Sequence, residues 1–590
     1  MIDEVEQVLS HFLSETIGEK RRHIFEIFSN LVKTAKKIVV LDADLGWISF
    51  NTLVSLRESR SLQQSRNTKK RHVSTQERAY IYINEWKPDN RSLSMYPTVF
   101  QLIQDIKSRV SEGKRVFVTS NSKAKIKALE KAIEDLGKDN DQAISMITIT
   151  SENSREKGVQ GFIKNIKTEI LKYQVILSSP SLGTGIDITF KNSDREIDCV
   201  YGIFENQINT HFEIDQQLAR VRHPGQIMVW ISSAKFSFET EFGVACQDYL
   251  QKSLVDSISW DLRSGQSGHP NEVPPFLHMA AMITSHQRAS KNNLKANFIK
   301  YKISQGWIIK YVSDDEMLNI EGSKFYQIGK EIGLKEWIKN ILVAKIMNEV
   351  QFDDFQDKLQ SNNSEYTEKD WFSYYRTNFE LFYGEPATDT LVTRDNKGTF
   401  RRNIKLFEQL LEMGSPDSIY SISSPIPESK TRRKIERMEV GIFKTRYDKN
   451  KLLYGLLSTT PIFKGGIFNP AIIFNVDQLV KFSELSIQLK AFVSTQLGIN
   501  TQADVDKKPI QHLGKLLKLV GLELEKSKVT NVNNVRTYHY AINPIKLNEI
   551  LVIVGKRPKS TDARWDYINE HYKLELSVID DCDLLLAERC

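Results

Sequence analysis

The sequence predicts an α/β protein whose central part is a parallel sheet covered by helices on both faces. Between residues 99 and 231, short apolar segments alternate with segments in which apolar residues recur at helical spacing. Such alternation is typical of a parallel sheet. A glycine-rich turn, SSPSLGTGID at 178–187, follows one of the predicted strands. Parallel sheets carry their functional loops at this end of their strands, so the turn also marks a candidate site.

The bulk composition is that of a large folded protein with a slight excess of positive charge. A chain of 590 residues suggests about four domains, and 40% hydrophobic with 26% charged residues is an ordinary globular balance. The net charge of +7 suits a polyanion partner, although it is spread over a long chain. Four scattered cysteines without metal-ligand spacing favour a reducing compartment. With no apolar run of bilayer length and no signal peptide, we expect a cytoplasmic protein without a membrane partner.

The first 95 residues are interpreted as a short α/β segment followed by a linker. Almost no strand precedes the acidic pair Asp3-Glu4. Apolar spacing predicts helices at Gln7–Phe12 and Lys20–Lys33, and strands at Lys37–Leu41 and Ala79–Ile83. The strand at 37–41 ends at Asp42-Ala43-Asp44. A polar stretch with two prolines, residues 87–97, is predicted to be the linker.

The central part, residues 96–265, carries the regular alternation. The predicted helices are Val99–Glu112, Ser122–Leu136 and Gly158–Ile170. The predicted strands are Arg115–Thr119, Met146–Thr150, Gln174–Ser178, Cys199–Phe204 and Ile227–Ile231. The SSPSLGTGID turn lies directly after the strand at 174–178.

The C-terminal part is predicted to be helix-rich over residues 276–420, to continue through a Ser/Pro linker at 421–435, and to end in a mixed domain at 436–590. Residues 505–545 resemble a winged-helix unit, with a helix at Gln511–Leu522 and a hairpin after it. A basic hairpin beside a helix suits duplex binding, while a solvated charged face is the plain alternative. The basic residues there are Lys507, Lys508, Lys515, Lys518, Lys526, Lys528 and Arg536.

Two segments of the central part carry residue types suited to phosphate chemistry. In the turn, Gly183 and Gly185 flank Thr184 and allow close backbone approach to a phosphate, and the Thr184 hydroxyl can donate to one. Asp187 could position a basic group or the nucleotide. Downstream, Glu213–Arg222 is predicted to be one helix that groups Gln216, Arg220 and His223. A guanidinium stays charged and offers several rigid donors, which suits a phosphoryl transition state.

The order and spacing of these segments resemble the second RecA-like lobe of superfamily 2 helicases. Among these, the sequence is most similar to cyanobacterial plasmid replication proteins of the RepA type, related to herpesvirus origin-binding helicases. Residues 178–187 match helicase motif V and residues 216–223 match motif VI. The RVFVTSNS segment at 115–122 matches the opening of that lobe. Residues 1–95 then resemble a partial first lobe, with motif II at Asp3-Glu4 and motif III at Asp42-Ala43-Asp44.

The resemblance implies ATP and Mg²⁺ as cofactors and assigns roles residue by residue. Asp3 would hold the Mg²⁺ bound to ATP and Glu4 would orient or deprotonate the attacking water. Gln216 and Arg220 would contact the γ-phosphate, assisted by Arg222 or His223, with the choice between these two left open. Asp42 and Asp44 would couple hydrolysis to movement. The residues implied at the DNA backbone or the nucleotide edge are Ser120, Ser181, Thr184, Gly185 and Asp187.

One part of such a motor is missing from this sequence. No G-x-x-x-x-G-K-[ST] phosphate loop occurs, so Asp3 and Glu4 lack the cradle that holds a nucleotide beside them. We therefore expect the C-terminal part of an ATP-dependent DNA helicase of plasmid replication, which binds ATP weakly and hydrolyses it negligibly on its own. Its partners would be DNA and a separate N-terminal helicase fragment. The alternative is a non-catalytic DNA-binding or replication-accessory protein that retains a helicase lobe as a scaffold.

Overall fold

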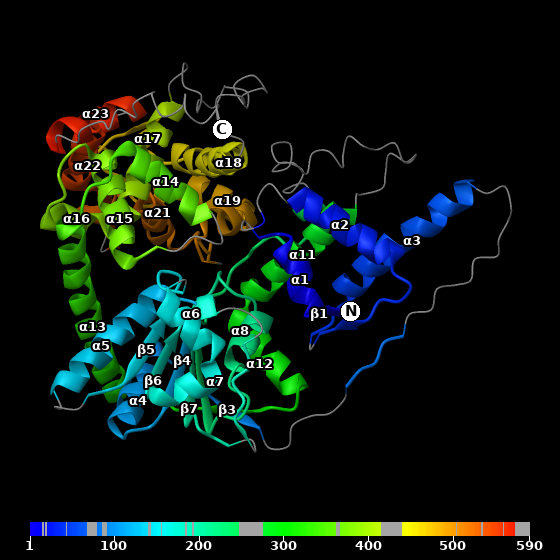
Figure 1. The fold of residues 1–590 in the computed structure, drawn as a ribbon. Coiled ribbons are helices and arrows are strands. Elements are labelled where there is room, and N and C mark those ends of the chain that lie inside the picture. Colours follow the sequence, from blue (N-terminus) through cyan, green and yellow to red (C-terminus); the bar gives the residue numbers. More distant parts are fainter. Residues whose placement is uncertain are drawn as a thin grey trace, which may run out of the picture.

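The computed structural model confirms the predicted α/β class. It describes residues 1–14, 17, 21–42, 44–67, 80–84, 91–139, 143–154, 156–182, 186–191, 194–246, 275–360, 366–414, 439–502, 504–532, 535–558 and 560–572. The centre of this described part is a seven-stranded parallel sheet with the order β5-β6-β4-β7-β8-β3-β9 (Figure 1). Its strands are β3 Ser92–Met95, β4 Val116–Ser120, β5 Met146–Ile149, β6 Val175–Ser178, β7 Cys199–Phe204, β8 Gln226–Ile231 and β9 Ile308–Tyr311.

Helices bury both faces of this sheet. One face carries α4 (Val99–Ser111), α5 (Lys123–Asp139) and α13 (Glu316–Val343). The other carries α6 (Lys157–Lys164), α7 (Ile166–Glu169), the 3-10 turn η2 (Ile170–Lys172), α8 (His211–Leu218) and α12 (Leu294–Ser304). The central strands β4, β6 and β7 are buried along their whole length. Strands of this kind read as continuous apolar runs, which is why the sequence predicts them well.

Two strands of the sheet come from segments outside the predicted lobe. β3 lies in the stretch interpreted as a linker, and it pairs with β8 on one side and β9 on the other. The linker interpretation of residues 92–95 is therefore wrong. β9 lies in the segment predicted to be helix-rich, at the edge of the sheet. Neither strand is buried along its length, since β3 buries only Leu93 and Met95, and β9 leaves Ile308 and Tyr311 exposed.

The N-terminal segment forms a small layer of its own against α11 (Pro275–Asn292). A two-stranded parallel sheet pairs β1 (Ile2–Asp3) with β2 (Val40–Leu41). Around it lie α1 (Val5–His11), α2 (Arg21–Thr34) and α3 (Trp47–Asn67). Their apolar side chains join those of α11 in one cluster, with the rings of Phe25 and Phe276 in edge contact at 4.9 Å. Figure 1 shows this layer, in blue, beside the green helix α11.

The C-terminal region is mostly helical. Its helices are α14 Glu349–Gln360, α15 Glu368–Tyr383, α16 Asp389–Asp395, α17 Thr399–Met413, α18 Glu439–Ser458, α19 Val480–Gln488, α20 Lys490–Phe492, α21 Pro509–Lys518, α22 Pro544–Lys556 and α23 Thr561–Tyr572. Short hairpin strands lie at β10 (Phe463–Lys464) and β11 (Ile467–Phe468), with a 3-10 turn η6 at Val476–Leu479 and a π-helical turn η7 at Val493–Leu497. A longer hairpin joins β12 (Leu524–Val532) to β13 (Val535–Ile542).

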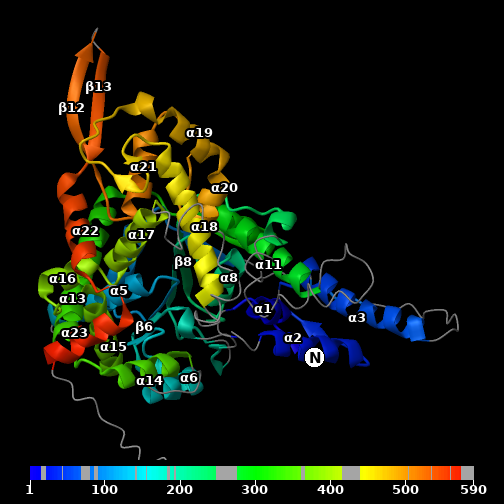
Figure 2. The same cartoon turned by 90° about the horizontal axis from the view of Figure 1, so that it is seen from above.

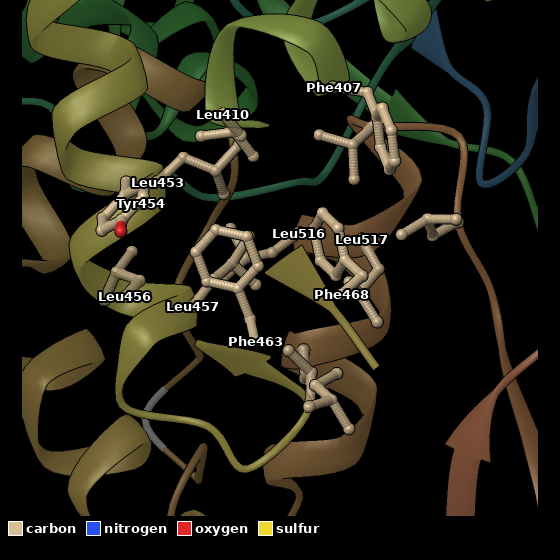
Figure 3. Packing of buried hydrophobic residues seen from close by; sticks show 14 of the residues in the cluster. Phe407, Leu410, Leu453, Tyr454, Leu456, Leu457, Phe463, Phe468, Leu516 and Leu517 are labelled. Atoms are coloured by element: carbon tan, nitrogen blue, oxygen red, sulfur yellow. The ribbon is translucent and has the colours of Figure 1, made fainter. Parts of the chain in front are cut away.

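A large apolar core holds this C-terminal region together. Phe463 and Phe468 are buried between α17, α18 and α21, and their ring centroids lie 4.6 Å apart (Figure 3). Leu516 and Leu517 of α21 point into the same core. The predicted helix followed by a hairpin at 505–545 is present as α21, β12 and β13. No helix within the described ranges is long and apolar enough to cross a membrane.

Candidate active site

The arginine segment stands at the C-terminal end of α8. Thr210 caps the start of this helix, and the Glu213 carboxylate accepts from the Thr210 amide in return. The helix ends at Leu218, so the prediction that it continues through Arg222 is wrong. The reason is a pairing of two extended segments. The Ile188 amide donates to the Arg220 carbonyl at 2.8 Å, and the Arg222 amide donates to the Ile188 carbonyl at 3.2 Å.

This pairing joins the two segments that the sequence singled out. Arg222 Nε donates to Asp187 Oδ1 at 2.8 Å, and the Thr189 hydroxyl donates to the same carboxylate at 2.9 Å. Burial opposes ionisation of Asp187, but these two hydrogen bonds outweigh it and hold the pKa of that carboxyl below its usual value. Asp187 is therefore an ionised partner of Arg222 in this structure.

Arg220 lies in a different environment from Arg222. Its Nη1 atom is buried and has no hydrogen-bond partner within the described residues. Burial lowers the pKa of its guanidinium to about 10, so the group still carries its charge at neutral pH. A buried charged donor without a partner costs free energy, and such a group is commonly matched to an ion or ligand. Arg220 is thus a cation whose buried Nη1 can bind an anionic group.

The N-terminal segment carries the predicted carboxylates Asp3, Glu4, Asp42 and Asp44, and it places Glu4 near Arg222 and Asp44 near Asp215. Asp42 accepts from the backbone amides of Glu6 and Asp44, at 2.8 Å each, and so ties β2 to the start of α1. Glu4 has a left-handed backbone (φ 53°). Partial burial, Asp42 and Asp3 raise the pKa of Glu4, and Arg222 acts in the opposite direction. Glu4 and Arg222 are therefore close enough to interact across the two segments.

Three side-chain contacts hold the N-terminal segment, α8 and α12 together. Gln7 Nε2 donates to Gln216 Oε1 at 2.5 Å, which joins α1 to α8. The Tyr301 hydroxyl of α12 donates to Asp44. Lys302, only 4% exposed, donates to Asp215 at 2.7 Å and lies 4.0 Å from the Trp307 ring centroid. We call this set the α12 latch. Sequence reasoning missed its α12 members, because Tyr301 and Lys302 lie far from every recognised motif.

The latch makes stability depend on pH through Asp44. Burial, and then Asp215 and Asp42, raise the pKa of Asp44 to about 6 against the Tyr301 hydrogen bond, which lowers it. The folded state therefore keeps a proton that the unfolded state releases near pH 4. As pH rises from about 4 to about 6 the free energy of unfolding should fall, and it should not change through this group outside that window.

We predict that Asp44→Asn removes this loss and raises the unfolding midpoint at neutral pH, because the amide needs no ionisation and can still accept from Tyr301. Thermal unfolding of both proteins between pH 3.5 and 8 tests it. The two midpoints should diverge between about pH 4 and 6 and run parallel above it. A difference that stays constant across the whole range would contradict the assignment.

The remaining predicted site residues fall into three groups. Thr184 and Gly185 lie outside the described residues, and of Ser181 only the backbone is described, in the 3-10 turn η3 (Pro180–Leu182). His223 is half-buried after the arginine pair. The structure does not support the nucleic-acid contact predicted for Ser120. It is fully buried, and its hydroxyl donates to the Ile203 carbonyl at 2.7 Å and accepts from the Ser122 amide. Ser120 therefore shapes the turn after β4 and does not face a nucleic acid.

The donor set suits a nucleotide better than a resident metal ion. Among the described residues, no group of three or more His, Cys, Asp or Glu side chains is arranged to hold a metal. An Mg²⁺ that arrives with a nucleotide needs only one or two protein carboxylates, since phosphate oxygens and water complete its shell. Asp3, which lies beside Glu4 and close enough to raise the pKa of that carboxyl, could supply one such carboxylate.

Comparison with known proteins gives two distant relatives. No family model matches the chain. The chain is 22% identical over 433 residues to an uncharacterized protein of the cyanobacterium Picosynechococcus sp., covering 68% of this chain and 40% of that protein. It is 23% identical over 231 residues to a protein of Acanthamoeba polyphaga mimivirus named "Putative replication origin-binding protein", covering 38% of this chain and 25% of that one. The alignments thus span less than half the length of either relative.

Proposed function

We propose that this chain is the C-terminal part of an ATP-dependent DNA helicase that acts in plasmid DNA replication. The observation that carries the proposal is Arg220, whose buried Nη1 has no partner among the described residues and lies where the two phosphate-suited segments pair. The all-parallel sheet with its functional loops at the ends of β6 and β7 supports it. The similarity to a viral protein named for binding a replication origin supports the replication role.

The residues of the site divide into two sides in this proposal. Asp3 would bind the Mg²⁺ that ATP brings, and Glu4 would orient the attacking water. The raised pKa of Glu4 makes its carboxylate a better proton acceptor. Gln216 of α8 and Arg220, two residues beyond its end, would contact the γ-phosphate, and either Arg222, after leaving Asp187, or His223 would assist. Bound Mg²⁺-ATP supplies the phosphoryl group and the charge that these residues stabilise.

The phosphate loop must come from another segment, and the N-terminal layer carries surfaces that such a segment could cover. Ile27, Leu31, Val39 and Trp47 are exposed on one small layer. In the part of the chain that the structure describes, its sheet consists of β1 and β2, and two strands alone are marginally stable. Tyr80–Ile83, predicted to be a strand, is not one; these residues form an irregular exposed segment without a pairing strand among the described residues. A strand needs a neighbouring strand, so a first-lobe polypeptide that extends the β1–β2 sheet would accommodate these residues.

Turnover of ATP with single-stranded DNA present tests the proposal. The DNA upstream of Met1 is read for an in-frame or frameshifted G-x-x-x-x-G-K-[ST] segment, and that polypeptide is then mixed with this chain. We expect negligible hydrolysis by this chain alone and DNA-stimulated hydrolysis by the mixture. Robust hydrolysis by this chain alone would contradict the need for a second polypeptide.

The second candidate function is a replication-accessory protein that binds DNA without hydrolysing ATP. Two observations favour it: the sequence has no phosphate loop, and the α12 latch already joins the segments that a motor would move. Under this function the mixture would show no DNA-stimulated hydrolysis, and the latch would hold the lobe as a fixed scaffold.

A further inference from the structure

The C-terminal region contains a helix and a hairpin that share a core but leave one side uncovered. Phe474 and Tyr540 exchange main-chain hydrogen bonds of 3.0 and 2.8 Å, which adds a third strand position to the β12–β13 hairpin. Helices α18, α19 and α21 pack with the base of this hairpin in one apolar cluster. The order of α18, the Phe474 strand, α19, α21 and the hairpin is that of a winged-helix unit, in which α21 holds the position of the recognition helix.

Helix α21 divides sharply into a buried and an exposed face. His512, Leu513, Leu516 and Leu517 are buried, and they fix the helix on the core. The exposed face presents Gln511, Lys515 and Lys518, at spacings of four and three residues. The helix contains no acidic residue. Its exposed stripe therefore offers only hydrogen-bonding and positively charged side chains.

The hairpin projects away from the body of the molecule, as Figure 2 shows for β12 and β13. Beyond its base both faces are open to solvent: Lys528 is exposed on one face, and Val529 and Arg536 on the other. Lys526 lies 4.7 Å from the ring centroid of Tyr538, which is itself 41% exposed. An uncovered two-stranded hairpin gains little stability from its own contacts, so a binding role explains its length better than a packing role.

We propose that the exposed face of α21 and the β12–β13 hairpin together bind duplex DNA, with α21 in the major groove and the hairpin on the adjacent backbone. This site is separate from the ATP site and does not depend on the proposed helicase activity. It would anchor the protein on double-stranded DNA while the lobe acts elsewhere.

Charge and shape favour duplex DNA over other partners. The B-DNA major groove admits one α-helix, and glutamine and lysine are side chains that read base edges there. Within the described residues, Lys515, Lys518, Lys528 and Arg536 form no ion pair, so their charge is available for phosphates. Lys508, just before α21, differs because it pairs with Asp504 at 2.8 Å. Helix α21 and the hairpin are two separate basic elements, so one can enter a groove while the other contacts the phosphates beside it. A flat anionic surface offers no such groove.

Fluorescence anisotropy with a labelled 25-base-pair duplex, without ATP, tests the proposal on the whole chain. The variants are the double changes Lys515→Ala/Lys518→Ala and Lys528→Ala/Arg536→Ala. The matched control is Lys330→Ala/Lys335→Ala, which removes the same charge from exposed positions on α13. We expect each site variant to bind roughly tenfold more weakly. Lys528→Ala/Arg536→Ala should also reduce the slope of log affinity against log salt by about 2, because about two phosphate contacts are lost.

The outcomes are distinct. Weakening by the site variants alone, with unchanged unfolding midpoints, supports the site. Equal weakening by the control, or no duplex binding by the wild-type chain, would overturn it. An equal weakening of single-strand binding by both site variants, or tighter binding to vesicles containing anionic lipid than to the duplex, would also overturn it. The duplex assay contains no ATP and its variants lie outside the proposed ATP site, so failure of the helicase proposal leaves this test intact.

Discussion

Replacing Arg220 by alanine is expected to lower DNA-stimulated ATP turnover about a thousandfold or more when the phosphate-loop polypeptide is supplied. The stability of the fold should not decrease. Arg220 Nη1 is buried without a partner among the described residues, so its removal breaks no hydrogen bond at that atom and relieves an uncompensated desolvation cost. We therefore expect the unfolding midpoint to stay unchanged or to rise. If Arg220 served only to stabilise the structure, its removal would lower the unfolding midpoint and leave the ATP turnover of the folded protein unchanged.

Arg222→Ala is the matched control, since it makes the same chemical change two residues further along. The Arg222 side chain is 58% exposed and pairs with Asp187, and such surface pairs contribute about 0–1 kcal/mol. Turnover should fall less than with Arg220→Ala, and the midpoint should barely change. Arg220→Lys should remain as slow as alanine, because one ammonium group cannot replace the planar guanidinium. A larger loss in the Arg222 variant than in the Arg220 variant would move the phosphate-contacting role to Arg222.

The pairing of the two central segments could be anticipated from sequence only in part. Their residue types and order indicated a common site, and the structure joins them through Ile188 and Val221. The end of α8 could not be anticipated, because Ala219, Arg220 and Val221 are acceptable helix residues by local propensity. A strand-like pairing with a segment more than thirty residues away overrides that propensity. The side-chain environments that distinguish Arg220 from Arg222 follow from the same non-local pairing.

Elements whose own residues carry the signal were predicted, and elements that depend on distant neighbours were not. In the hairpin β12–β13, residues alternate on both sides of a short turn, and this pattern predicts a hairpin. β3 also alternates, but it has four residues and no hairpin turn beside it, and β9 is equally short, so the sequence does not distinguish either strand. Lys302 has no local signal either. It takes part in the site only because α12 packs on α8 and brings it within 2.7 Å of Asp215.

Helix α13 provides the second large effect, because two of its glycines lie against the backbones of neighbouring helices. A Cβ added at Gly329 would lie 2.0 Å from the Ala128 carbonyl oxygen of α5. At Gly322 it would lie 1.9 Å from the Phe100 carbonyl oxygen of α4. Backbone atoms cannot turn aside as a side chain can, so α13 would have to move away from the sheet layer. We predict that Gly329→Ala lowers the free energy of unfolding by about 3 kcal/mol.

Gly333→Ala, one helical turn further along, should have the opposite sign. A Cβ there would meet only Lys131 Cγ at 3.6 Å, which is an ordinary contact. Alanine in a helix interior is more stable than glycine by about 0.5–1 kcal/mol, so this variant should be slightly stabilised. Chemical denaturation of both variants measures the two changes. If the free energy of unfolding rose by the same small amount in both variants, α13 would not lie directly on α5.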